Sequence, residues 1–185
     1  MGLLTFAINV TLDGCYDHRV GIADEELHDY FTRLMDASGA FLYGRANYEL
    51  MEEAWPSIAR DESAPRALRE WAVKLEGKRK YVVSTTRSDF SWNNTVHVQG
   101  DLRERVKALK ESTPLGLLVG GQQLAASLEK LGLIDDYRIV VHPVLAGKGP
   151  TLFQGALQQP KQLDVVSVER FKSGVMALHL RPMKT

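Results

Sequence analysis

The stretch "PLGLLVGGQQLAASLEKLG", residues 114–132, joins a short apolar run to a pair of glycines and then to a helical pattern. The run is too short and too continuously apolar for a helix, so it predicts a buried strand over 116–120. Leucine then recurs at helical spacing as far as Gly132, which suits the residue after a helix end. A strand that passes directly into a helix at Gly120 and Gly121 predicts an α/β unit.

The glycine pair stands where a helix presents unpaired backbone amides and a partial positive charge. Because glycine has no side chain, a phosphate could approach the backbone closely at Gly120 and Gly121. A tight turn between strand and helix would also select glycine, and the residues alone leave these two interpretations about equal.

The alternation of strand and helix extends in both directions. Short apolar runs predict further buried strands over 3–10, 40–44 and 80–84. Amphipathic patterns predict a helix with Asp24 as its N-cap, a second helix that ends at Pro56, and a third over 101–111. The segment 56–71 is expected to be a surface excursion before a helix that ends near Leu75.

The C-terminal third changes to strict alternation. Apolar and polar residues alternate between 162 and 181 on both sides of Gly174, which predicts an antiparallel hairpin. The expected fold is therefore α/β, with a mostly parallel central sheet, flanking helices and a C-terminal antiparallel hairpin. The first hairpin strand has apolar residues on both faces, which predicts a homodimer through this part of the sheet. The alternative is a monomer in which a helix or the loop 146–160 covers the apolar residues on the second face of this strand.

Composition narrows the functional classes. The 185 residues are 44% hydrophobic and 25% charged, which suits one globular domain over residues 1–185. Lys plus Arg number 23 and so do Asp plus Glu, so the charge favours a small-molecule partner over a nucleic acid. The single Cys15 excludes an intramolecular disulfide, and no apolar run approaches the roughly 20 residues that span a membrane. With neither a basic leader nor a cleavage pattern at its start, the protein is expected to be cytoplasmic.

Five motifs, in order and in register, resemble a known family. They are "INVTLDG", "LYGRANYELMEEAWP", "VVSTTR", "LLVGGQQL" and "VHPVLAGKGPTLF". Together they resemble the dihydrofolate reductase-like superfamily, and more closely the stand-alone relatives of the reductase domain in bacterial riboflavin biosynthesis, the RibD C-terminal family. The resemblance covers nearly the whole chain. It implies NADPH as cofactor and the reduction of a small heterocycle or imine, similar to the reduction of 5-amino-6-(5-phosphoribosylamino)uracil.

The resemblance implies a cofactor contact at the glycine pair, and the residues themselves indicate two more. The cofactor pyrophosphate would lie against the glycine pair and the following amides, a second anion contact would lie in "GRANY", and "STTR" would hold the adenosine 2′-phosphate. The implied residues are Gly44, Arg45, Asn47, Ser84, Thr85, Arg87, Gly120, Gly121, Gln122 and Gln123. Each has a simpler alternative: Arg45 could pair with Glu49 one turn on, and the hydroxyls could serve only the loop.

The proton donor is the least determined part of the site. Reduction of a carbon–nitrogen double bond needs a proton at nitrogen, so a carboxylic acid or a bound water is required. Asp13 takes the Asp-Gly position of the family, and Glu26, at the start of the first helix, lies near the region from which dihydrofolate reductases present their acid. A turn role for Asp13 and a helix-dipole role for Glu26 remain open. The five histidines are scattered and Cys15 is alone, so no metal site is expected.

Other functions fit the same residues. A pterin reductase similar to dihydrofolate reductase is one, and a protein that binds a nucleotide on this fold without efficient turnover is another. A purely structural dimerisation module is a third, and it would have no affinity for NADPH. The residues do not identify the substrate.

Overall fold

The computed structural model describes residues 1–183, so residues 184 and 185 of the expected single domain over 1–185 lie outside the described residues. The described chain forms one eight-stranded sheet with helices on both faces. In chain order its elements are β1 (Leu4–Thr11), α1 (Glu25–Ala37), β2 (Ala40–Gly44), α2 (Arg45–Arg60), α3 (Arg66–Gly77), β3 (Arg79–Val83), β4 (Thr95–Val98), α4 (Leu102–Ser112), β5 (Leu117–Gly120), α5 (Gln122–Lys130), β6 (Asp136–His142), β7 (Leu163–Arg170) and β8 (Met176–Pro182).

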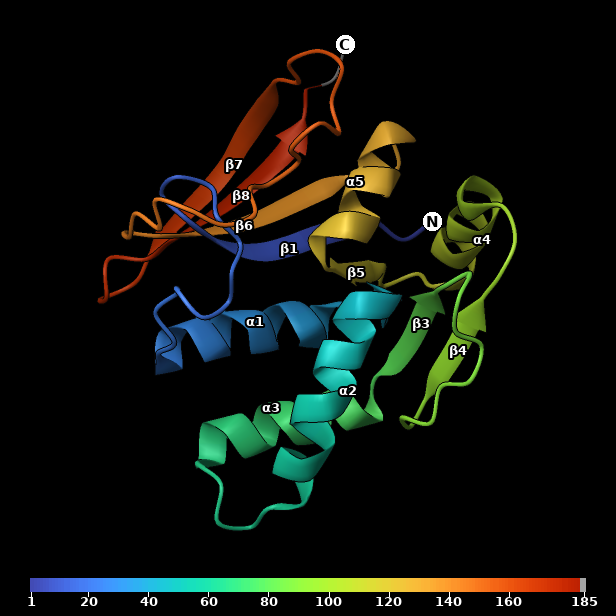
Figure 1. Ribbon diagram of the computed structural model, residues 1–185, viewed down its shortest axis with the longest axis horizontal. Coiled ribbons are helices and arrows are strands. Elements are labelled where there is room, and N and C mark those ends of the chain that lie inside the picture. The colour runs from blue at the N-terminus through green and yellow to red at the C-terminus, as the bar shows by residue number, and fades with distance from the viewer. Residues whose placement is uncertain (184–185) are drawn as a thin grey trace.

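The strand order across the sheet is β4-β3-β2-β5-β1-β6-β8-β7 (Figure 1). The six strands from β4 to β6 run parallel, and β8 and β7 add an antiparallel pair at one edge. Their turn contains Gly174 with a φ of +86°. The expected α/β fold with a C-terminal hairpin is thus confirmed.

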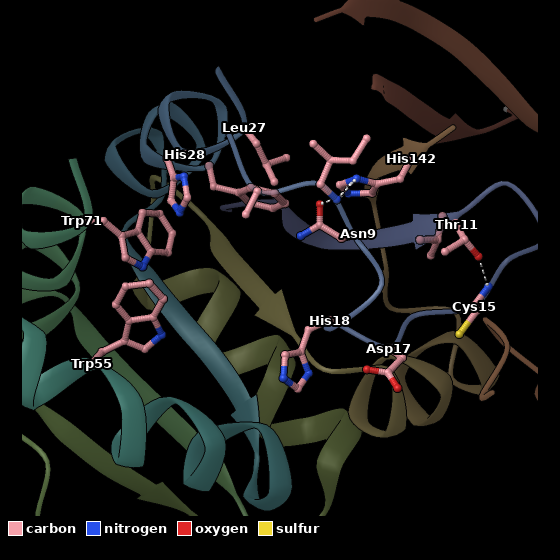
Figure 2. A pocket seen from close by; sticks show the side chains of 15 residues that line it. Asn9, Thr11, Cys15, Asp17, His18, Leu27, His28, Trp55, Trp71 and His142 are labelled. Carbon is pink, nitrogen blue, oxygen red and sulfur yellow. Dashed lines mark hydrogen bonds between the residues drawn. The ribbon is translucent and has the colours of Figure 1, made fainter. Parts of the chain in front are cut away.

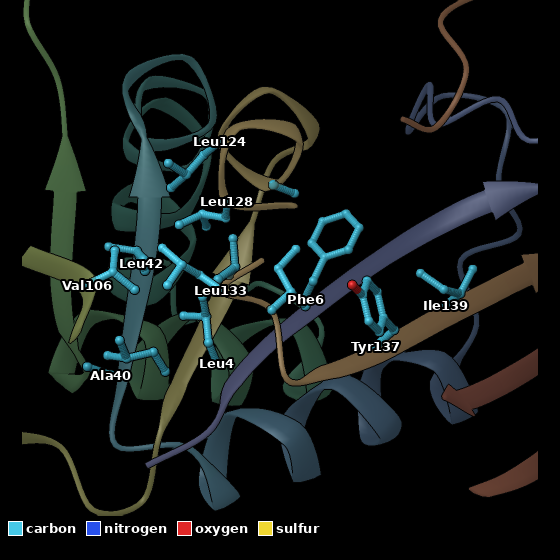
Figure 3. Packing of buried hydrophobic residues seen from close by; sticks show 14 of the residues in the cluster. Leu4, Phe6, Ala40, Leu42, Val106, Leu124, Leu128, Leu133, Tyr137 and Ile139 are labelled. Atoms are coloured by element: carbon cyan, nitrogen blue, oxygen red, sulfur yellow. The ribbon is translucent and has the colours of Figure 1, made fainter. Parts of the chain in front are cut away.

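Two helical layers enclose the sheet. On one face, Leu124 and Leu128 of α5 and Val106 of α4 pack against Phe6 and Leu42 (Figure 3). On the other face, α1, α2 and α3 cover a second cluster that contains Met35, Tyr48 and Trp71. Burial on both faces explains why the central strands are continuously apolar. The helices α1 and α5 follow the neighbouring strands β1 and β5, but they lie on opposite faces of the sheet. This divergence determines where a ligand site can lie.

The predicted helix ends are largely confirmed. Asp24 accepts a hydrogen bond from the Leu27 amide at 2.8 Å as the N-cap of α1, and Gly132 follows α5 with a φ of +63°. The predicted end of α2 at Pro56 is wrong, because the helix continues to Arg60. Proline removes one helical hydrogen bond, but tertiary packing supplies more helix stability than local propensity. None of the five helices in the described part is long and apolar enough to cross a membrane.

The segment after Pro56 is also more regular than predicted. The expected surface excursion over 56–71 contains the last turn of α2 and the first half of α3. Trp55 and Trp71 join these helices with ring centroids 6.0 Å apart. The strand β4 has only four residues and was not predicted.

The edge strand β7 keeps apolar side chains exposed. Val165, Val166 and Val168 are 64%, 48% and 54% exposed, so the loop 146–160 does not cover them. An uncovered apolar edge is a surface on which a second chain can pair. The homodimer stays a prediction.

Candidate active site

Two glycine turns lie side by side at the carboxyl edge of the sheet. β2 pairs with β5 in the register Tyr43 to Gly120, so the chain turns into α2 at Gly44 next to the place where it turns into α5 at Gly121. Both glycines are helix N-caps and have no side chain with which to bind the first-turn amides. Two helix N-termini without side-chain caps favour an anion between them.

The side chain of Asn47 packs directly against the second turn. A Cβ atom at Gly121 would lie 2.7 Å from the Asn47 Cβ, and one at Gly120 would lie 2.8 Å from its Nδ2. Gly121 also has a φ of +93°, which side chains rarely tolerate. The turn therefore requires these glycines with or without a ligand. This requirement gives a physical basis to the interpretation that the glycine pair serves a tight turn between strand and helix. Gln122 and Gln123 follow in the first turn of α5.

Arg45 pairs with a carboxylate on its own helix. Its Nη1 lies 2.9 Å from Glu49 Oε2, as the simpler interpretation expects. Both side chains are more than a third exposed, so water screens this pair and it contributes little to stability. A phosphate at the start of α2 could replace the glutamate as the partner of Arg45.

The third predicted anion contact is engaged internally. Arg87 donates to Glu52 at 2.8 Å, and Ser84 Oγ accepts the Arg87 amide at 2.9 Å. Burial raises the pKa of Glu52, but the hydrogen bonds from Arg87 and Tyr48 outweigh it and leave that pKa below its ordinary value. Thr85 is exposed beside them. A cofactor 2′-phosphate would have to compete with Glu52 for the guanidinium.

A cavity of about 270 Å³ opens at the carboxyl end of β1, on the face of the sheet covered by α1, α2 and α3 (Figure 2). Leu27 and Phe31 of α1 form one wall, and Trp55 and Trp71 form another. The cavity lies where the helices after β1 and β5 leave for opposite faces of the sheet, which is where open α/β sheets bind ligands. The lining residues are Asn9, Val10, Thr11, Cys15, Asp17, His18, Gly21, Ile22, Ala23, Leu27, His28, Phe31, Trp55, Trp71 and His142.

His142 holds Asn9 in one orientation in this cavity. The Ile22 amide donates to His142 Nδ1 at 2.9 Å, so the proton of the neutral ring lies on Nε2, which donates to Asn9 Oδ1 at 3.0 Å. Burial lowers the pKa of His142, which favours this neutral form. Because Oδ1 is used, the Asn9 amide turns its Nδ2 away from His142 and toward the open pocket (Figure 2). Asn9 is therefore an oriented hydrogen-bond donor.

The remaining acidic and histidine side chains of the cavity are Asp17, His18 and His28. Hydrogen bonds from Arg19 hold the pKa of Asp17 well below its ordinary value, so this carboxyl is ionised. His28 Nδ1 donates to the Asp24 carbonyl at 2.7 Å, which leaves Nε2 as the acceptor in the neutral ring. His18 is exposed at the mouth. Among residues 1–183 no three His, Cys, Asp or Glu side chains form a metal-binding group.

The two carboxyls proposed from the sequence lie outside the cavity lining. Asp13 accepts a hydrogen bond from Thr11 and from the amides of Ala146, at 3.1 Å, and Gly147, at 2.7 Å. These bonds lower its pKa to about 2, so it anchors the loop as an ion and is a poor proton donor near neutral pH. Glu26 accepts the Lys172 amide at 2.7 Å, beside the turn between β7 and β8.

Sequence reasoning missed Asn9, His142 and the tryptophan wall. Alternation along β1 places Asn9 on the opposite face from the core residue Phe6, which could have marked Asn9 as facing α1. A polar residue at that position of a buried strand was the available signal. The sequence around Trp55 and Trp71 does not indicate that the two side chains meet in the wall of this cavity.

Comparison with known proteins agrees with this geometry. The sequence model of the RibD C-terminal domain matches residues 3–177. The uncharacterized protein YyaP of Bacillus subtilis (strain 168) is 30% identical over 173 residues, which cover 91% of this chain and 89% of that protein. A solved structure of a putative riboflavin biosynthesis protein from Shewanella sp. PV-4 has a TM-score of 0.75 at 19% identity, with 98% of this chain and 99% of that chain covered.

A second solved structure belongs to a longer protein, the diaminohydroxyphosphoribosylaminopyrimidine deaminase/5-amino-6-(5-phosphoribosylamino)uracil reductase of Thermotoga maritima. It has a TM-score of 0.69 at 21% identity, and the match covers 98% of this chain but 57% of that protein. At these identities the two structures establish a shared fold. Together with the family match over residues 3–177, they confirm the resemblance drawn from the five motifs.

Proposed function

The chain belongs to the RibD C-terminal domain family, and on that premise we propose that it is an NADPH-dependent reductase of a small heterocyclic or imine substrate. The observation that carries the proposal is a cavity at the carboxyl end of β1, at the same edge of the parallel sheet as two uncapped helix N-termini at the ends of β2 and β5. Such an arrangement suits a reactive ring in the cavity and a pyrophosphate at the helices. The reductase named for Thermotoga maritima is the guide to the reaction class.

The residues present fit a nicotinamide dinucleotide. The first-turn amides of α2 and α5 and the side chain of Arg45 would hold its pyrophosphate, and Ser84, Thr85 and Arg87 would hold a 2′-phosphate. The glycine turns leave backbone where side chains would otherwise stand. When bound, NADPH supplies a hydride to the substrate carbon.

The proton for the substrate nitrogen has to come from another group. Asp17 and Asp13 are ionised and His142 is held neutral by its partners. We therefore propose His18 as the proton donor in place of Asp13 and Glu26, because histidine is the side chain that most often transfers protons in enzymes and His28 offers its free Nε2 as an acceptor.

Two measurements test the proposal. Titration with NADPH, followed by the fluorescence of the three tryptophans, measures cofactor binding, and NADPH oxidation with a panel of pyrimidines and pterins measures turnover. The proposal expects saturable binding and turnover of at least one compound. Binding without turnover would favour a ligand-binding protein, and no affinity for NADPH would favour a structural module. His18→Gln should lose turnover while NADPH binding is kept, and unchanged turnover in this variant would show that His18 is not the proton donor.

We further propose that the enzyme is a cytoplasmic homodimer. The exposed apolar side chains of β7 support pairing through the C-terminal edge of the sheet.

A further inference from the structure

The cavity carries no permanent positive charge. Of the described residues that line it, none is lysine or arginine, and its one acidic side chain, Asp17, is an ionised carboxylate. Phosphate groups in proteins are bound by arginine, lysine or free helix amides. The cavity lining offers neither of the two basic side chains.

The helix N-terminus next to the cavity is closed to anions. α1 begins beside the lining residues Ala23 and Leu27, but its first-turn amide at Leu27 is bound by the Asp24 carboxylate at 2.8 Å. Glu25 and Glu26 add two more negative charges to this first turn. A phosphate here would meet like charge in place of free amides.

The arginine beside the mouth is already paired. Arg19 donates to both oxygens of Asp17, from Nε at 2.9 Å and from Nη2 at 2.5 Å. This two-point arrangement is the strong form of an arginine–carboxylate contact. The pair leaves no net positive charge at this side of the cavity.

The lining does offer a pattern that suits a flat, uncharged ring. Asn9 directs amide hydrogens into the cavity, and the hydrogen bond from His28 Nδ1 to the Asp24 carbonyl leaves its Nε2 as the nitrogen that can accept. Phe31, Trp55 and Trp71 supply aromatic surface. Aromatic walls bind planar rings by stacking and edge contacts, and a few oriented polar groups fix the orientation.

We propose that the substrate is an uncharged, planar nitrogen heterocycle without a phosphate group, whose carbonyl accepts from Asn9 and whose ring N–H donates to His28. This inference rests on the proposed reductase function. It sets the substrate of this chain apart from the phosphorylated compound in the name of the Thermotoga maritima protein.

A matched pair of ligands tests the inference. The probes are 5-amino-6-(5-phosphoribosylamino)uracil and its dephosphorylated form, each titrated against the NADPH-saturated protein and each assayed for NADPH oxidation. We expect the dephosphorylated compound to bind at least about tenfold more tightly. Equal or tighter binding of the phosphorylated compound, or no binding of either, would overturn the inference. Preferential binding of the dephosphorylated compound, with no NADPH oxidation by it or by any compound of the panel, would support the inference and reject the reductase function.

Two substitutions locate the cause. Asn9→Asp keeps the size of the side chain but removes its amide hydrogens, and it should weaken binding of the dephosphorylated probe about tenfold or more. Asp17→Asn removes the carboxylate and frees Arg19, so it should narrow the preference between the probes. Asp36→Asn is the matched control, because that carboxylate pairs with Lys74 away from the cavity and its removal should leave the preference unchanged. If Asn9→Asp binds the dephosphorylated probe as tightly as the wild type does, Asn9 does not donate a hydrogen bond to the ring.

Discussion

Replacing Gly121 by alanine should destabilise the protein even in the absence of a cofactor. Two costs add at this residue. Its φ of +93° with ψ of 128° is a conformation that alanine rarely adopts, and the new Cβ would lie 2.7 Å from the Asn47 Cβ on α2. The backbone cost is about 1 to 3 kcal/mol and the overlap costs about 1 to 3 kcal/mol more.

Two other glycines provide matched controls. Gly132 shares a positive φ of +63° but has open space around its Cβ position, so Gly132→Ala bears only the backbone cost, about 1 to 2 kcal/mol. Gly77 ends α3 in open space and its φ is outside the left-handed region, so Gly77→Ala should be neutral or stabilise by up to about 1 kcal/mol.

Thermal unfolding of the apo proteins measures the series. For a chain of this size each kcal/mol shifts Tm by roughly 2 to 4 °C, so Gly121→Ala should lose about 4 to 24 °C and Gly132→Ala about 2 to 8 °C. Gly77→Ala should be the most stable of the three variants, Gly132→Ala should be intermediate, and Gly121→Ala should be the least stable. If Gly121→Ala proves as stable as Gly132→Ala, the overlap with Asn47 has no energetic weight. NADPH titration of folded Gly121→Ala then measures how much the substitution also weakens cofactor binding.

Three further predictions concern charge and assembly. Glu52→Gln should free Arg87 and tighten NADPH severalfold relative to NADH in a fluorescence titration; an unchanged ratio would mean that Arg87 does not meet the 2′-phosphate. The pKa of His142 lies below the ordinary 6.5, so the unfolded state binds more protons in that window and the urea midpoint should fall as pH drops below about 6.5. His142→Gln should flatten this pH dependence, and an unaltered slope would point to other groups. Light scattering should give a mass near twice 20.7 kDa that Val166→Lys halves, whereas a monomeric wild type would refute the edge pairing.

Local signals in the sequence were enough for most of the fold. The apolar runs predicted β1, β2, β3 and β5, because a strand buried on both faces has no polar side to alternate with. Asp24 and Gly132 predicted helix ends, because their effects act within one turn of backbone. The prediction that α2 ends at Pro56 failed because it used the same kind of local signal. The preference of proline for ending a helix was outweighed by tertiary packing, which the local sequence does not show.

The position of the two glycine turns was also readable along the chain. Gly44 and Gly120 each end a predicted strand just before a helix, and parallel strands bring such turns to one edge. The sequence did not reveal that Arg87 pairs with Glu52, since the two residues belong to separate elements. It also did not reveal that Asn47 fills the space beside Gly121.

The cavity, in contrast, was decided by tertiary structure alone. Asn9 and His142 are 133 positions apart, and they meet only because β6 pairs with β1 in a particular register. Trp55 and Trp71 reach the same cavity because α2 and α3 pack on the face that α1 covers. Hydrophobic periodicity determines which side of an element is buried, but the residue that it meets there depends on strand order, register and helix packing, which are set by the whole chain at once.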